Sequence, residues 1–200
     1  QLGALRDIDF GIYPYTSSSQ TLAAYAPIGA GVPGAKLNNV IGIMKAYSTC
    51  VGEGPFTVEM FGEEAEKLRA AGGEYGAATG RPRRVGPFDV PASRYGVRMQ
   101  GADCIALTKL DVLSYMDRIP VCAAYEIDGE KTTAFPTGER LNRAKPVIEY
   151  LPGFGDVSQC RDFNDLPENA RQYIRFLEKA VGCPVHYVSV GAGREEYMAL

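Results

Sequence analysis

One stretch of the chain reads Cys104-Ile105-Ala106-Leu107-Thr108-Lys109-Leu110-Asp111, an apolar run that ends abruptly in polar and charged residues. Its four apolar side chains follow a charged residue and predict a short buried strand. The residues from Thr108 to Asp111 then lie at the carboxyl end of that strand, which is where open α/β sheets bind their ligands. The stretch therefore predicts an α/β fold and one edge of a binding site.

Segments with strand and helix periods alternate upstream of this stretch. Residues 39–48 (NVIGIMKAYS) are largely apolar and predict a second buried strand, and a glycine-punctuated loop follows at 51–55. A helix is expected after that loop, closed by a glycine pair. Its predicted buried face carries Phe61, Ala65 and Leu68.

Further elements are predicted downstream. Apolar runs at 121–127 and 131–135 flank Asp128-Gly129, a dipeptide that tolerates positive φ and favours a tight hairpin. A helix is expected after Asp165 and Pro167, and a last strand at 184–190. The helix should bury Ala170, Tyr173, Ile174, Leu177 and Val181 and end at Gly182.

Together these elements predict one α/β domain over residues 1–200, with a mixed, mostly parallel sheet and flanking helices. The composition agrees, since 46% of the residues are hydrophobic and 22% are charged. A net charge of -3 argues against a nucleic-acid partner held by a broad basic face. No run reaches the roughly 18 to 20 apolar residues of a membrane span, so we expect no membrane and a cytoplasmic location.

The cysteines and the single histidine offer little chemistry. Five widely spaced cysteines without a C-x-x-C pair are expected to be reduced and buried rather than metal ligands. His186 lies in an apolar run and is expected to be structural. The sequence also begins with Gln1 instead of methionine, which makes it look like a piece of a longer chain.

Residues 76–84 (GAATGRPRR) place small residues beside the three guanidiniums of Arg81, Arg83 and Arg84. Small residues let a ligand approach the backbone closely, and arginine forks bind carboxylates and phosphates through paired hydrogen bonds. Pro82 limits how the flanking side chains spread. Either an anion site or a solvated basic loop is compatible with this pattern.

The segment from Thr108 to Asp111 is similar to the [N/T]-K-x-D element that recognises guanine. In that element the carboxylate accepts hydrogen bonds from N1 and the 2-amino group of guanine, a pair that adenine lacks. The lysine stem can lie against the base. The alternative is a strand that ends in a lysine and an aspartate by chance.

Two other motifs give weaker hypotheses. The G-x-G-x-x-G match at 29–34 is rejected as a dinucleotide site, because no strand precedes it and Pro33 occupies the turn that should donate amides. Hydroxyls at 16–19 would bind phosphate or simply cap a turn. The sequence contains no G-x-x-x-x-G-K-[ST] phosphate loop.

Several longer blocks closely resemble adenylosuccinate synthetase, and they span essentially all 200 residues in one register. The blocks are 7–15 (DIDFGIYPY), 45–49 (KAYST), 51–56 (VGEGPF), 79–84 (TGRPRR), 107–113 (LTKLDVL), 166–170 (LPENA) and 188–191 (VSVG). The resemblance implies the carboxy-terminal half of that enzyme, which is the carboxy-terminal part of a P-loop-NTPase-like synthetase fold.

The resemblance implies a GTP-dependent ligase that forms adenylosuccinate from IMP and L-aspartate in AMP biosynthesis. GTP with Mg²⁺ would phosphorylate the inosine 6-oxygen, and the aspartate amino group would then displace the phosphate. The phosphate loop and the catalytic groups lie in the amino-terminal half of the family, so no catalytic residue and no Mg²⁺ ligand is expected in residues 1–200. The complete enzyme is expected to be a homodimer, and this chain alone to be inactive.

The same resemblance implies which residues bind substrates. The aspartate loop would consist of Ala77, Ala78, Thr79, Gly80, Arg81, Pro82 and Arg83, with Arg81 also reaching IMP and Arg83 also reaching GTP. Ser17 and Val51 would contact IMP. The guanine site would consist of Lys109, Leu110 and Asp111 with Ser189, Val190 and Gly191.

The chain departs from the family pattern at three positions. The glutamine that contacts IMP falls on Leu2 by strict register, with Gln1 one place earlier. Ser17 stands in place of a threonine, and Ala78 in place of a hydroxyl residue. A different reading remains open, in which the chain is a stand-alone guanine-nucleotide-binding module or an assembly module without catalysis.

Overall fold

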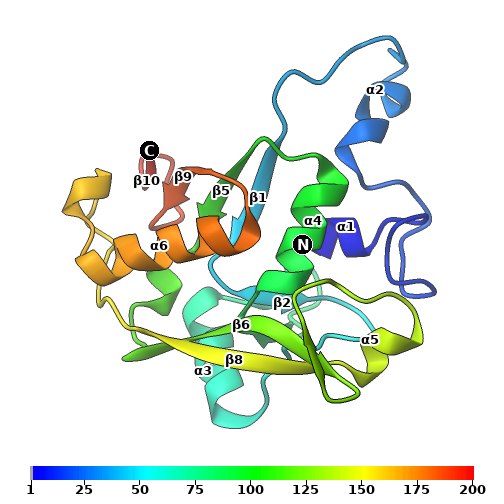
Figure 1. Cartoon of the computed structure of the whole chain (residues 1–200). Coiled ribbons are helices and arrows are strands. Elements are labelled where there is room, and N and C mark those ends of the chain that lie inside the picture. Colours follow the sequence, from blue (N-terminus) through cyan, green and yellow to red (C-terminus); the bar gives the residue numbers. More distant parts are fainter. Residues whose placement is uncertain (1) are drawn as a thin grey trace.

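The computed structural model describes residues 2–200 and contains three sheets (Figure 1). The first sheet has the order β1-β5-β9-β10. Strands β1 (Ile41–Lys45), β5 (Cys104–Thr108) and β9 (Val185–Ser189) are parallel, and β10 (Tyr197–Ala199) is antiparallel to β9. The predicted strand at 104–107 is thus confirmed, and it lies inside the sheet because β1 and β9 both pair with it.

The second sheet is built around the long strand β6 (Arg118–Ile127). It pairs with β8 (Lys145–Pro152) and β7 (Glu130–Thr132) in antiparallel fashion and with β4 (Phe88–Asp89) in parallel. Strands β2 (Ser48–Cys50) and β3 (Arg84–Gly86) form a separate antiparallel pair. The α/β class is confirmed, but mostly parallel pairing holds only for the first sheet.

Helices pack between and beside the sheets. In Figure 1, α6 (orange) runs across the first sheet, α4 stands beside α1, and α3 passes behind β8 and extends below it. The longer helices are α3 (Gly62–Gly72), α4 (Val90–Gln100) and α6 (Glu168–Val181); the short ones are α1 (Leu2–Leu5), α2 (Ala26–Gly29), α5 (Glu139–Arg143) and the 3-10 turns η1 (Ala23–Tyr25), η2 (Asp111–Leu113) and η3 (Phe163–Asp165).

Helix α6 follows its sequence prediction closely. All five predicted side chains are buried, and Gly182 ends the helix at φ 76°. The hydroxyl of Tyr173 donates a 2.6 Å hydrogen bond to the carbonyl of Ala46, just beyond β1. The helix therefore fixes the segment that leaves the carboxyl end of β1.

The other downstream elements are confirmed with small changes. Asp128 and Gly129 both have positive φ, 54° and 86°, as a two-residue hairpin turn requires. Strand β7 ends at Thr132, however, three residues before the predicted limit. The strand predicted at 184–190 is β9, but it is not the last, because β10 returns antiparallel beside it.

Two upstream predictions are wrong in part. The buried strand expected at 39–48 is only β1, and the side chain of Ile43 is 66% exposed. Strand β1 pairs with β5 alone among the described residues, so it borders the sheet instead of lying within it. Phe61 is 76% exposed at the N-cap position of α3, and only Ala65 and Leu68 of the predicted face are buried.

Residues 23–28 form η1 and the start of α2, which agrees with rejecting a dinucleotide site after them. All five cysteines are free, and Cys160 alone is only partly buried. His186, expected to be structural, is exposed on β9. Across residues 2–200, every helix is too short or too polar to cross a bilayer.

Candidate functional site

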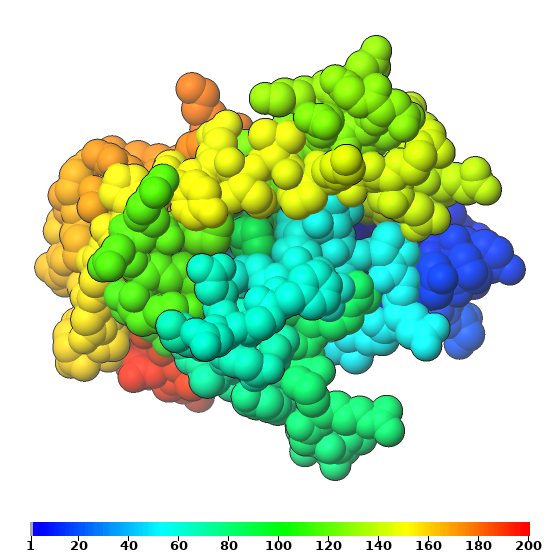
Figure 2. Space-filling model, turned by 90° about the horizontal axis from the view of Figure 1, so that it is seen from below, coloured from blue at the N-terminus to red at the C-terminus, as the bar shows by residue number. Residues whose placement is uncertain are grey.

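The arginine loop, residues 76–83, projects from the end of α3 as a small hairpin. Gly73 ends the helix in the left-handed region, and the amide of Gly80 donates to the carbonyl of Gly76 at 2.8 Å. A single bridge between Tyr75 and Pro82 closes its base. Seen from below, this part of the chain stands out from the body of the molecule (Figure 2). The exposed residues of the hairpin are Ala77, Ala78, Thr79, Gly80, Arg81 and Pro82.

Arg83 leaves the hairpin and turns toward the buried carboxylate of Glu74. The side chain of Glu74 is fully buried. Its carboxylate accepts hydrogen bonds from two ammonium groups, that of Lys45 at 2.8 Å and that of Lys109 at 3.1 Å. The guanidinium of Arg83 lies 3.1 Å away, and the hydroxyl of Tyr47 donates to the same carboxylate. One carboxylate thus gathers cations from the ends of β1 and β5 and from the arginine loop.

The charge of this cluster is not balanced. Burial alone would raise the pKa of Glu74, but hydrogen bonds from Lys45, Tyr47 and Lys109 lower it to about 2. The pKa of Lys45 is also lowered, because burial of the ammonium and repulsion by Lys109 and Arg83 outweigh the attraction of Glu74. One carboxylate serves three cations, so the cluster keeps an excess positive charge. An anionic ligand is its natural complement.

The two predicted segments of the guanine site lie side by side. The amide of Leu110 donates to the carbonyl of Ser189 at 3.1 Å, and the hydroxyl of Ser189 donates to the carbonyl of Gly191 at 2.8 Å. Lys109 has a positive φ of 60°, which turns the chain sharply after β5. Val190, between Ser189 and Gly191, is buried in the main hydrophobic core. The pairing of β5 with β9 brings both segments to one end of the sheet.

Three buried side-chain polar atoms in residues 2–200 lack a hydrogen-bond partner; one is Oγ of Ser114, and the other two belong to predicted site residues. These two are Oδ1 of Asp111 and Nε of Arg83. Burial raises the pKa of Asp111, and hydrogen bonding by its own backbone amide and the charge of Lys109 only partly oppose this. An acceptor and a donor left unpaired inside a protein cost free energy that a ligand can recover. Arg83 contacts Glu74, and Glu74 contacts Lys109, which lies two residues before Asp111, so a short chain of contacts connects these two residues.

Ser17 and Val51 lie near each other, because Arg6 connects them. The amide of Ser17 donates to the carbonyl of Arg6 at 2.8 Å, and the Arg6 guanidinium donates to the carbonyl of Val51 at 2.8 Å. The hydroxyl of Ser17 bonds to Ser19 within its own turn, and the side chain of Val51 is 59% exposed. Val51 directly follows β2, whose Cys50 is paired with Arg84 on β3.

Arg84 does not act as the free guanidinium that its sequence position predicted. It pairs with the carboxylate of Glu59 at 2.9 Å and donates to the carbonyls of Gly52 at 3.2 Å and Gly54 at 2.8 Å. Its charge is therefore neutralised, and its donors stabilise the 51–55 loop. Arg81 and Arg83 are the loop arginines available to a ligand.

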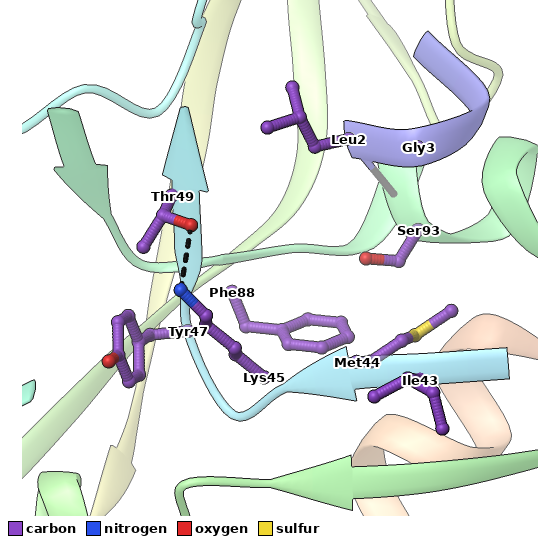
Figure 3. A pocket seen from close by; sticks show the side chains of 9 residues that line it. All are labelled: Leu2, Gly3, Ile43, Met44, Lys45, Tyr47, Thr49, Phe88 and Ser93. Atoms are coloured by element: carbon purple, nitrogen blue, oxygen red, sulfur yellow. Dashed lines mark hydrogen bonds between the residues drawn. The ribbon is translucent and has the colours of Figure 1, made fainter. Parts of the chain in front are cut away.

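A cavity of about 180 Å³ lies between α1, β1, β2 and α4 (Figure 3). The ammonium of Lys45 donates to the hydroxyl of Thr49 at 3.0 Å in its wall, so this lysine borders both the cavity and the Glu74 cluster. Leu2 reaches the cavity from α1, which is where the resemblance places a glutamine. Gln1 lies outside the described residues. The polar lining groups are Lys45, Tyr47, Thr49 and Ser93.

Glu74 and Lys45 are candidate functional residues that were not predicted from the sequence. Glu74 directly follows the glycine pair that ends α3, and Lys45 is the last residue of β1. The position of Lys45 at a strand end was a usable signal, the same one that identified Asp111. Within residues 2–200, no three side chains of His, Cys, Asp or Glu gather as a possible metal site, so no role is assigned to Mg²⁺ there.

The chain matches the family model described as adenylosuccinate synthetase over residues 1–198. The chain belongs to the adenylosuccinate synthetase family. It is 48% identical to the adenylosuccinate synthetases of Mycobacterium marinum, over 97% of this chain and 45% of the relative, and of Thermobifida fusca, over 99% and 47%. The chain therefore spans about half the length of the curated relatives it matches.

A solved structure agrees with this assignment to the adenylosuccinate synthetase family. The fully ligated adenylosuccinate synthetase of Plasmodium falciparum superimposes with a TM-score of 0.93 at 39% identity, over 98% of this chain and 48% of that chain. A succinoaminodeoxyadenylate synthetase of cyanophage S-2L is similar in fold alone, with a TM-score of 0.53 at 16% identity. The P-loop-NTPase-like character of the fold is confirmed by the first match.

Proposed function

We propose that residues 1–200 are the carboxy-terminal half of an adenylosuccinate synthetase and supply the guanine, aspartate and part of the IMP contacts. The complete enzyme would join IMP and L-aspartate with hydrolysis of GTP to GDP and phosphate. Membership of the family supports this proposal, and it disfavours the alternative of a stand-alone nucleotide-binding or assembly module. We expect a cytoplasmic homodimer that uses Mg²⁺ with ligands outside this chain.

The observation that carries the guanine assignment is the unpaired, buried Oδ1 of Asp111 at the end of β5. A carboxylate accepts from N1 and the 2-amino group of guanine together, and such charge-assisted bonds are stronger than neutral ones. Lys109 would lie along the base, and Ser189, Val190 and Gly191 would close the site from β9. The hydrogen bond between Leu110 and Ser189 supports one site built from both segments.

The excess positive charge around Glu74 supports the anion assignments. The Nε donor of Arg83 is buried and has no partner. The side chain as a whole is 33% exposed, so a carboxylate or phosphate can reach its exposed part. Arg81 is exposed on the hairpin and can meet the same ligand. Holding the L-aspartate carboxylates there would orient its amino group toward IMP, which lowers the entropic part of the barrier. Ser17 and Val51 would contact IMP from the neighbouring loop.

The proposal is tested by titrating the protein with GDP, IDP and ADP in a calorimeter. GDP should bind most tightly, and Asp111→Asn should weaken GDP binding about 10- to 100-fold, because a hydrogen bond to a charged group contributes roughly 1.5–3 kcal/mol. IDP lacks the 2-amino group, so its affinity should fall less than that of GDP on Asp111→Asn. Asp128→Asn, an exposed carboxylate on the hairpin turn, is the matched control and should bind GDP normally.

Equal affinity of the unaltered protein and Asp111→Asn for GDP would refute the guanine assignment. Catalysis is tested separately, by following adenylosuccinate formation chromatographically in the presence of IMP, L-aspartate, GTP and Mg²⁺. We expect no product from residues 1–200 alone, since the sequence has no phosphate loop. Turnover by this chain alone would show that it holds catalytic groups we have not identified.

A further inference from the structure

Glu74 contacts three cations of the site without lying on the surface. Its carboxylate is 0% exposed, and all of its described partners are donors: two ammonium groups, one guanidinium and one phenol. The side chains of those cations are partly exposed, 26% for Lys45, 33% for Arg83 and 37% for Lys109. A ligand can therefore touch the cations but not the carboxylate that holds them.

The three cations come from three different ligand-facing elements. Lys109 begins the guanine segment after β5, Arg83 ends the arginine loop, and Lys45 borders the cavity beside β1. Lys109 also donates to the carbonyl of Gly72, so its ammonium is held at the carboxyl end of α3 as well. The backbone reinforces this arrangement, because the amide of Arg83 donates to the carbonyl of Glu74 at 2.9 Å.

We propose that Glu74 is a positioning residue that couples the guanine segment to the arginine loop, so that an anion bound at one changes the affinity for ligand at the other. The inference rests on the proposed function, because it takes the two segments as binding sites for guanine nucleotide and for a dicarboxylate. When a ligand anion binds one of the three cations, the ion pair of that cation with Glu74 weakens. The ion pairs of the other two cations with Glu74 then become stronger. Because binding coupling is reciprocal, each ligand affects the other by the same factor.

Loss of the Glu74 charge should affect nucleotide binding differently from loss of the Asp111 charge. Asp111 recognises groups that only guanine has, whereas Glu74 fixes the lysine stem that lies against any purine. Removing the charge of Glu74 should therefore weaken GDP and IDP binding by similar factors and leave their ratio unchanged. Removing the charge of Asp111 should reduce the ratio itself. The two variants separate positioning from base recognition.

The experiment measures GDP and IDP dissociation constants for the protein and for Glu74→Gln, with and without saturating L-aspartate. We expect Glu74→Gln to lower both nucleotide affinities about tenfold and to abolish the effect of L-aspartate on GDP binding. Glu74→Asp keeps the charge and should therefore retain part of the nucleotide affinity and part of the L-aspartate effect. Glu168→Gln, an exposed ion-paired glutamate on α6, is the matched control.

Folding is checked independently, because a structural defect lowers the binding stoichiometry and the circular dichroism signal, whereas a positioning defect changes the dissociation constant at unchanged stoichiometry. A double-mutant cycle with Lys109→Met should be non-additive, since each change removes the same contact. A folded Glu74→Gln protein that binds GDP as before and responds to L-aspartate as before would overturn the inference. If Asp111→Asn also leaves GDP binding unchanged, the proposed function fails instead.

Discussion

The backbone amide of Leu110 lies 3.1 Å from the carbonyl oxygen of Ser189 and donates a hydrogen bond to it. The bond continues the parallel pairing of β5 with β9, whose last paired residues are Leu107 and Val188. Two loops that are far apart in the sequence are thereby held as one wall. Any change that displaces residues 189–193 should therefore alter the environment of Asp111.

Gly191→Ala is expected to displace that loop. A Cβ at this position would overlap the carboxylate of Glu196, which accepts the amide hydrogen of Gly193 and holds the loop closed. We expect a loss of GDP affinity of about three- to tenfold with little change in the melting temperature, since Val190 is the one fully buried residue of the 189–193 segment. Calorimetric titration and a thermal melt measure both.

Gly34→Ala is the control for this substitution, because a Cβ there meets nothing within 4 Å and its φ is not positive. It should leave the GDP affinity unchanged. Normal GDP binding by Gly191→Ala would show that the loop does not close the guanine site.

The sequence predicted elements whose signals are local. Helix α6 combines five apolar residues at helical spacing with Pro167 before it and Gly182 after it, and each of those signals acts within a few residues. Strand β1 was misjudged because an apolar run does not reveal whether a neighbouring strand will cover it. Ile43 is exposed for that reason, since β1 pairs only with β5 among residues 2–200.

The same distinction separates the site residues that were predicted from those that were missed. Asp111 was identifiable because it closes a four-residue motif at a strand end. Glu74 has no such motif, and its ammonium partners come from Lys45 and Lys109, 29 and 35 residues away. Arg84 looked equivalent to Arg83 in sequence, yet the β2–β3 pairing turns it toward Glu59. Tertiary neighbours, which no local pattern encodes, decide each case.

Arg84→Lys should loosen the loop at residues 51–55 without unfolding the protein. The guanidinium donates to two loop carbonyls and to Glu59 at once, and it lies 5.5 Å from the ring centre of Phe56. An ammonium is a compact charge that cannot reproduce this planar fork. We expect amide hydrogen exchange in the loop to accelerate about tenfold, as measured by mass spectrometry.

Arg143→Lys is the corresponding control, since Arg143 pairs with the exposed carboxylate of Asp128 and, within residues 2–200, makes no hydrogen bond to the loop. Exchange at 51–55 should not respond to it. Unchanged exchange in Arg84→Lys would mean that Arg6, which donates to the carbonyls of Val51 and Glu53, is sufficient to hold the loop.

Glu74 should contribute to stability above its unfolded pKa and lose that contribution in acid. Its pKa falls from 4.5 to about 2 on folding, so the folded state binds this proton more weakly than the unfolded state. Lowering the pH from 5 to 2 should therefore reduce the free energy of unfolding by about 1–3 kcal/mol through this group, the range allowing for solvent screening of the partly exposed cations. The groups that face it are Lys45, Tyr47, Arg83 and Lys109.

Urea unfolding of the protein and of Glu74→Gln at pH 5, 4, 3 and 2 measures this effect. The variant should be less stable at pH 5, and the difference between the two proteins should shrink as the pH falls. A difference that is constant over this range would mean that Glu74 does not change its protonation on folding.

Asp89 should have the opposite dependence on pH. It is buried at the N-cap of α4, where its Oδ1 accepts the amide of Ala92 at 3.1 Å and its Oδ2 accepts the hydroxyl of Tyr125 at 2.6 Å. Burial raises its pKa from 3.8 to about 6, although both hydrogen bonds act in the other direction. A carboxyl group with a raised pKa stabilises the fold fully below pH 3.8, and this contribution is lost as the pH rises through 6.

Asp89→Asn removes the titration but keeps an acceptor for Ala92 and an amide that can face Tyr125. Between pH 4 and pH 7, the free energy of unfolding of the protein should therefore fall by about 2–3 kcal/mol relative to that of Asp89→Asn. Tyr125→Phe should shift the same loss to higher pH, because the hydroxyl that favours the charged form is gone. Urea unfolding at unit pH steps gives the free energy of unfolding of all three proteins. If the curves of the unaltered protein and Asp89→Asn against pH are parallel, Asp89 titrates outside this range.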